Sequence, residues 1–105
     1  MKKNYLPLFE YVTLQTILRL KDQAYAMELV RQLSVVFNKN MSHGQVVTTL
    51  KRMVNKGLLT CEERQQPRGR SIIVYTLTPT AQTITERTKQ ILSGLLLLLV
   101  AIHRT

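Results

Sequence analysis

Apolar residues recur at intervals of three and four along the first part of the chain, a spacing that predicts amphipathic helices. The first stripe starts after Pro7, which suits the opening turn of a helix, and predicts a helix over 7–20. It contains Leu8, Tyr11, Val12, Leu14, Gln15, Ile17 and Leu18. A polar turn over 21–23 leads to a second predicted helix over 24–37, whose apolar face would hold Met27, Val30 and Leu33.

The segment 42–59 has the clearest helix signals in the chain. Ser42 and Gln45 have the spacing of a capping box, in which each side chain bonds the backbone amide of the other residue. Gly57 supplies the stop, because glycine adopts the left-handed conformation at little cost. We therefore predict a helix over 43–56. Its buried side would hold Val46, Val47, Leu50, Met53 and Val54.

After Gly57 the pattern becomes typical of strands. The segments 58–65 and 71–77 read as two strands, and the second is rich in β-branched and aromatic residues. The turn between them, 66–70, contains Pro67 and Gly69, residues that favour tight turns. The sequence predicts a β-hairpin with a basic tip.

Thr78 and Pro79 restart a helix, as its N-cap and its first helical residue. A heptad-like seam then follows at Ile84, Thr88, Ile91, Leu95, Leu98 and Ile102. A helix that continues to 102 extends past a small core, so we expect this seam to form the interface of a homodimer. The apolar stretch 91–102 is shorter than the ~20 residues that cross a bilayer, and no membrane insertion is expected.

The order of these elements predicts an α+β, mainly helical fold: a winged helix-turn-helix. Residues 1–78 would form the DNA-binding domain, with a loose arm over 1–6, a three-helix core and a two-stranded β-hairpin wing. Residues 79–105 would form a long C-terminal dimerisation helix packed on the same domain.

The composition points to a polyanionic partner. Fifteen Lys and Arg residues against six Asp and Glu give a net charge of +9, which suits nucleic acid. The single Cys61 excludes an internal disulfide, and the first ten residues lack the apolar core of a secretory signal, so we expect a cytoplasmic, nucleoid-associated protein. No catalytic motif or metal-spaced Cys/His cluster appears, so no enzymatic activity, metal or cofactor is expected.

Double-stranded DNA is the predicted partner, contacted by two segments. The outward side of the helix over 43–56 carries hydrogen-bonding residues and cations but no carboxylate, with the candidates Ser42, His43, Gly44, Gln45, Thr48, Thr49, Lys51, Arg52 and Asn55. Arginine can bind guanine edges, and glutamine or asparagine can bind adenine. The wing would add Arg64, Gln66, Arg68, Gly69 and Arg70, as phosphate or minor-groove contacts. A solvated helix face and a charged, soluble turn are the alternatives, and Gln45 is less free if it completes the capping box.

The chain resembles the PadR family of transcriptional regulators. Residues 25–33 are similar to the family pattern H-G-Y-E-I-I-K-R-L, and 42–59 to S-P-G-T-L-Y-P-A-L-R-R-L-E-x-x-G-L-L. The wing pattern G-R-x-x-x-Y-Y-x-L-T matches 69–78. Three positions depart from the family: Val47 replaces a tyrosine, His43 replaces a proline, and Met27 stands where tyrosine is usual.

This resemblance implies a dimeric, repressor-like protein whose C-terminal helix dimerises. It also implies that Ser42, Gly44, Gln45, Arg52, Gly69 and Arg70 occupy DNA-facing positions. We expect a homodimeric transcriptional repressor that occupies an operator. A plasmid or phage replication or partition protein with the same fold is one alternative, and a winged-helix module that binds another protein is a second.

Overall fold

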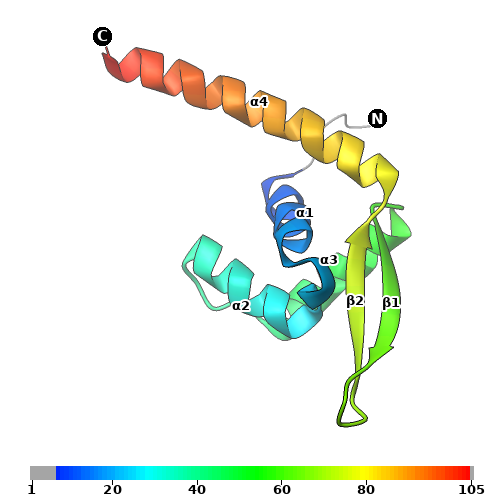
Figure 1. Cartoon of the computed structure of the whole chain (residues 1–105). Helices are drawn as coiled ribbons and strands as arrows, with labels where there is room; N and C mark the ends of the chain where they lie inside the picture. Colours follow the sequence, from blue (N-terminus) through cyan, green and yellow to red (C-terminus); the bar gives the residue numbers. More distant parts are fainter. Residues whose placement is uncertain (1–6, 105) are drawn as a thin grey trace.

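A computed structural model describes residues 7–104, and the arm expected over 1–6 lies outside the described residues. The elements are α1 (Leu8–Leu20), a 3-10 turn η1 (Lys21–Gln23), α2 (Ala26–Phe37), α3 (His43–Asn55), β1 (Leu59–Gln65), β2 (Ser71–Leu77) and α4 (Pro79–Arg104). Figure 1 shows α1, α2 and α3 beside a projecting hairpin, with α4 running across the opposite end. The predicted winged helix-turn-helix and its long C-terminal helix are confirmed.

The wing is an antiparallel hairpin tied to the helical core. Its register runs from Leu59 opposite Leu77 to Gln65 opposite Ser71. A third short segment joins it, since Tyr25 forms a bridge with Val74 and the amide of Tyr75 donates to the carbonyl of Ala24 at 2.9 Å. Tyr25 is extended in this pairing, which explains why α2 begins at Ala26 and not at 24 as the pattern predicted.

The core lies where the inner faces of the helices meet the sheet. It contains Leu14, Ile17, Ala24, Leu29, Leu33, Met41, Val46, Leu50, Met53, Leu58, Leu59, Tyr75, Leu77 and Ala81. Two predicted helix faces are correct only in part. In α2 Leu33 is buried and Val30 packs against the core as predicted. Met27, however, is 58% exposed, and Leu29 is buried in its place. In α1 the buried stripe is centred on Leu14 and Ile17, and Leu8 is exposed.

Two polar residues belong to the buried face of α1 although the apolar pattern did not include them. Thr13 and Thr16 are buried because their hydroxyls donate to the carbonyls of Phe9 and Val12, at 2.8 and 2.7 Å within the same helix. A threonine satisfied in this way presents only its methyl group to its neighbours. A prediction based on apolar residues therefore cannot place such positions in the core.

The long helix α4 packs on the core with its first half only. Thr78 caps it, with its hydroxyl accepting from the amide of Ala81 at 3.2 Å, as predicted. Ile84 packs against the core cluster and Thr88 is buried, so the predicted dimer seam is wrong at these two positions. The first half of α4 contacts both α1 and β2 of the same chain. Beyond them Ile91, Leu95, Leu98 and Ile102 are exposed.

The second half of α4 extends past the helical core (Figure 1). Its run from 95 to 100 is apolar and exposed at every position. Among residues 7–104, no helix combines the length and the apolar character that a membrane span requires.

Candidate nucleic-acid interface

The entry into α3 is fixed by two local hydrogen bonds. Ser42 has an extended backbone, and its hydroxyl accepts from the amide of Gln45 at 3.0 Å, so the predicted N-cap is confirmed. Within the described residues the return bond from the Gln45 side chain is not formed. The Gln45 side chain is therefore exposed and available to an outside partner.

The connection from α2 to α3 is also held by a side chain. Ser34 donates to the carbonyl of Val30 at 2.7 Å and accepts from the amide of Met41 at 3.0 Å. Asn38 ends α2 in the left-handed conformation. The hydroxyl of Ser34 therefore satisfies the backbone amide of Met41, in the tight turn that places α3 across α2.

The exit from α3 has the predicted glycine stop. Gly57 has φ of +78°, its amide donates to the carbonyl of Val54 at 3.0 Å, and the amide of Leu58 donates to Met53 at 2.9 Å. This pair of bonds is a Schellman motif, which requires a left-handed residue at the glycine. The length and the ends of α3 thus follow from residues near its termini.

Eight of the nine residues that we predicted for the DNA face of α3 are exposed. Exposed residues are Ser42, His43, Gly44, Gln45, Thr48, Lys51, Arg52 and Asn55. Thr49 is the exception, because it is only 5% exposed and its hydroxyl donates to the carbonyl of Gln45 at 3.0 Å. Its predicted place on the outward face is wrong. Val47 and Val54, which we expected to be buried, are only half-buried.

The C-terminal end of α3 is paired with a carboxylate that the sequence pattern did not reveal. Glu10 of α1 is 5% exposed, and its Oε2 lies 3.1 Å from Nζ of Lys56 and 3.7 Å from Nε of Arg52. Arg52 is therefore half-exposed yet already ion-paired. Glu10 precedes Lys56 by 46 positions, so no local motif connects them.

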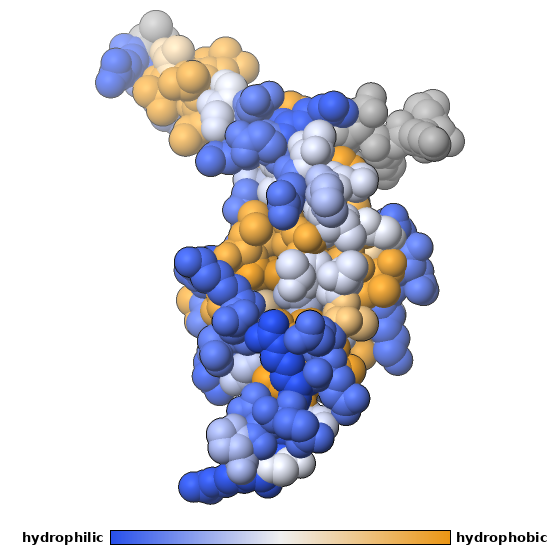
Figure 2. All heavy atoms as spheres, turned by 45° about the vertical axis from the view of Figure 1, so that its right-hand side comes forward, coloured by the Kyte–Doolittle hydropathy of each residue, from blue (hydrophilic) through white to orange (hydrophobic). Residues whose placement is uncertain are grey.

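The wing tip turns on a proline and a glycine, as predicted. The amide of Gly69 donates to the carbonyl of Gln66 at 2.9 Å, and the amide of Gln66 donates to the carbonyl of Arg70 at 2.7 Å. Gly69 has φ of +82°, the left-handed conformation that closes a three-residue hairpin loop. Arg68 and Arg70 are exposed, and neither has an ion pair within residues 7–104. In Figure 2 the wing tip is a hydrophilic projection at the lower end of the molecule.

Arg64 occupies a different position, in β1 opposite Ile72 and one pair before the turn. Its guanidinium lies 2.9 Å from a Glu62 oxygen and 3.2 Å from an Asp22 oxygen. The hydrogen bond to Glu62, followed by the one to Asp22, raises the pKa of Arg64 above its ordinary value. Because Asp22 belongs to η1, Arg64 links the wing to the helical core. Gln66, also predicted to contact DNA, is half-buried beside the tip.

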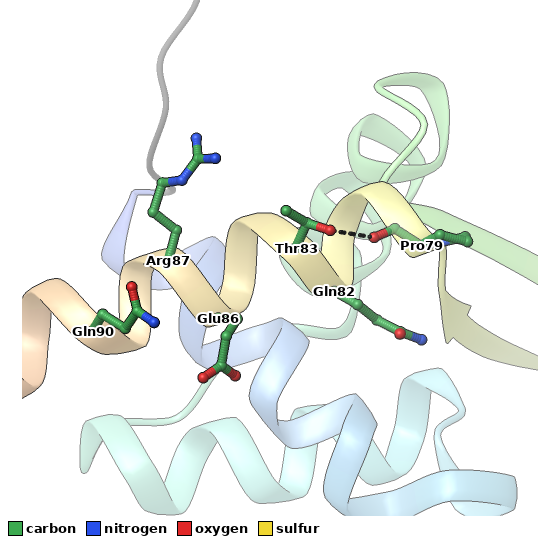
Figure 3. Close-up of a pocket in the computed structure, with 6 residues that line it drawn as sticks. All are labelled: Pro79, Gln82, Thr83, Glu86, Arg87 and Gln90. Atoms are coloured by element: carbon green, nitrogen blue, oxygen red, sulfur yellow. Dashed lines mark hydrogen bonds between the residues drawn. The ribbon is translucent and has the colours of Figure 1, made fainter.

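A shallow depression on α4 offers no comparable chemistry. It is lined by Pro79, Gln82, Thr83, Glu86, Arg87 and Gln90. Figure 3 shows these side chains spreading in different directions from a single helix. The marked bond is local, from the hydroxyl of Thr83 to the carbonyl of Pro79 at 3.2 Å. The exposed face of α3 and the wing thus remain the candidate interface.

Comparisons with known proteins agree with this geometry. A PadR-like transcriptional regulator from Bacillus cereus has the same fold, with a TM-score of 0.77 and 20% identity over 93% of each chain. A Streptococcus transcriptional regulator superposes with a TM-score of 0.70 and 18% identity, over 93% of this chain and 98% of that one. No curated protein sequence matches the chain.

A model of a protein family also matches the amino-acid sequence itself. The model of the transcriptional regulator PadR-like family covers residues 16–87, about two thirds of the chain. Members of this family regulate transcription and are not enzymes, which confirms the prediction that the protein is not an enzyme. The match also favours a transcriptional regulator over the replication or partition alternative. The chain belongs to the PadR-like family of DNA-binding transcriptional regulators.

Proposed function

We propose that the protein is a homodimeric transcriptional repressor that acts by occupying an operator. The N-terminal half of α3 would enter the major groove, and the wing tip would contact phosphates or the minor groove. One observation carries this proposal: an exposed helix face without carboxylates lies in the same domain as a wing whose tip arginines lack ion pairs. Lysines and arginines that are free of internal partners can neutralise phosphates.

The first turn of α3 supports close approach by DNA. Gly44 is exposed and its φ is not in the left-handed region. Among residues 7–104, no atom beyond its chain neighbours and its own helix backbone would lie within 4 Å of a Cβ at this position. Neither backbone strain nor internal packing explains a glycine at this position. A DNA backbone close to the helix N-terminus would explain it, because the free amides and the helix dipole favour a phosphate there.

The wing is tested by a pair of matched double variants. Arg68→Ala with Arg70→Ala removes the two tip cations, whereas Arg87→Ala with Lys89→Ala removes two exposed cations of α4. Fluorescence anisotropy with an operator duplex should show a loss of about tenfold per tip arginine near 0.1 M salt, and a salt slope shallower by about 1.8. The α4 variant should lose much less affinity. Equal losses in both variants would reduce the effect to net charge and overturn the wing contact.

Repression is tested separately from binding. Transcription in vitro from a promoter that contains the operator should decrease as the protein is added, and the promoter should be protected in a footprint. An increase in transcription at the same occupancy would identify an activator and contradict the proposed repressor.

The homodimer would form through the second half of α4. Ile91, Leu95, Leu98 and Ile102 are 55%, 49%, 57% and 56% exposed and follow heptad spacing. A second copy of the same helix covers such a seam by twofold symmetry.

Sedimentation tests this dimer with two variants of the same helix. Leu98→Glu places a charge on the seam and should give monomers. Leu97→Glu places the same charge away from the seam, at a position that is 71% exposed, and should perturb the dimer less. Monomeric wild-type protein at micromolar concentration would contradict the proposed assembly.

A further inference from the structure

Glu10 is a buried carboxylate held between two cations of another helix. It lies in the first turn of α1, whereas Arg52 lies in the last turn of α3 and Lys56 is its C-cap. Acidic groups are favoured near helix N-termini and basic groups near C-termini, so both helix dipoles stabilise this arrangement. Only the carboxylate is shielded: its side chain is 6% exposed, against 53% for Arg52 and 49% for Lys56.

Arg52 also belongs to the face of α3 that would meet DNA. It follows Thr48 by four residues and Gln45 by seven, and all three are exposed. Residues at these spacings lie on one side of a helix, and positions seven residues apart are separated by about 10 Å along the helix axis. A long side chain at this point can turn either to a phosphate or to Glu10. The structure holds it toward Glu10.

We propose that Glu10 acts as an internal competitor of DNA phosphate, withdrawing Arg52 and Lys56 from contact with DNA of arbitrary sequence. This inference rests on the proposed binding of DNA through α3. Binding to arbitrary sequences depends on how many phosphates the protein neutralises. A regulator must keep that binding weak relative to its operator, because the genome presents a large excess of competing sites. A carboxylate that keeps two cations bound to the protein serves this need.

The substitution Glu10→Gln tests the proposal, because it removes the charge and keeps the size of the side chain. The probe is a random-sequence 20-bp duplex, titrated at several salt concentrations. Glu10→Gln should bind this duplex about tenfold more tightly near 0.1 M salt for each cation released, and its salt slope should steepen by about 0.9 to 1.8.

Glu28→Gln is the matched control. It makes the same chemical change at another ion pair, the one that Glu28 forms with Arg31 within α2 at 3.1 Å. Both variants raise the net charge by one. An effect of total charge would therefore appear equally in both, and equal affinities and slopes for the two variants would overturn the proposal.

A triple variant tests whether any gain in affinity for the random duplex comes from Arg52 and Lys56. Adding Arg52→Gln and Lys56→Gln to Glu10→Gln should remove the extra slope, and a slope that stayed steep would overturn the proposal. Glu10→Asp keeps the carboxylate at a shorter reach and provides a folded variant if glutamine unfolds the domain. Its affinity for the random duplex should lie between that of wild type and the affinity expected for Glu10→Gln. An affinity equal to that of wild type would overturn the proposal.

The wild type separates this inference from the proposed function. Wild-type protein that binds the duplex, with Glu10→Gln indistinguishable from it, would overturn the role of Glu10 and leave DNA binding intact. Wild-type protein that binds neither an operator nor random DNA would overturn the proposed function and, with it, this inference.

Discussion

The two ends of α3 differ in the partners that their side chains already have. At the N-terminal end Ser42, Gly44, Gln45 and Thr48 are exposed and uncharged, and the helix is capped by its own serine. At the C-terminal end the cations Arg52 and Lys56 are held by Glu10 of α1. The uncharged end is free to contact a partner. The charged end ties the helix to the rest of the domain.

The same contrast recurs in the wing. Arg64 in β1 is bound to Asp22 and Glu62, whereas Arg68 in the turn has no ion pair among residues 7–104. A count of cations therefore overstates the charge that is available to DNA. Available charge depends on which carboxylates the fold brings close, and three variants or pairs of variants test this distinction on α3.

The largest effect on stability is expected at the tethered end. Arg52→Ala with Lys56→Ala leaves the carboxylate of Glu10 buried without a cation, which costs about 3 kcal/mol of unfolding free energy. For a domain of this size the midpoint of thermal unfolding should fall by about 14 °C. Urea and thermal denaturation followed by circular dichroism measure both quantities.

Lys51→Ala is the control for that variant. Lys51 is an exposed cation of the same helix, and its removal should change the unfolding free energy by less than about 0.5 kcal/mol. If the double variant also lost less than about 0.5 kcal/mol of unfolding free energy, Glu10 would be solvated, and its ion pairs with α3 would not stabilise the domain.

A smaller effect is expected at the capped end. Ser42→Ala removes the acceptor of the Gln45 amide and should cost about 1 kcal/mol of unfolding free energy. Ser42→Asp preserves the cap and the stability, but it places a carboxylate where a phosphate is proposed to lie. Anisotropy should therefore show a loss of operator affinity for Ser42→Asp in a fully folded protein. Undiminished affinity would move the DNA away from this end of the helix.

Local features of the fold were predictable from sequence, whereas contacts between distant segments were not. The caps at Ser42 and Thr78 and the glycine stop at Gly57 depend on residues within one or two turns, and all three were predicted. The pairing of Glu10 with Lys56 depends on how α1 crosses α3, which no periodicity encodes. For the same reason the sequence placed Arg52 on the DNA face without its partner.

The predicted faces failed where a polar residue is satisfied inside its own helix. Thr13 and Thr49 both donate to the carbonyl four residues earlier, so burying them leaves no hydroxyl without a partner. The predicted dimer seam of α4 was wrong at two positions for another reason. One heptad pattern continues through Thr88 and Leu95, but the fold of the chain buries only the first of these positions. The pattern shows which side of the helix is apolar and does not show what covers it.

The smallest and most selective effect should separate two adjacent threonines of α3. Thr48 is exposed, whereas Thr49 is buried with its hydroxyl bonded to Gln45. Thr48→Val removes an exposed hydroxyl and should weaken operator binding by roughly fivefold, about 1 kcal/mol, with stability unchanged. Thr49→Val removes a hydroxyl that never faces outward, so operator affinity should remain at the wild-type value while stability changes by no more than about 1 kcal/mol. Because valine has the shape of threonine, both variants keep the packing of the helix. A loss of affinity for Thr49→Val equal to that for Thr48→Val would mean that α3 meets DNA with a different face from the one that burial indicates.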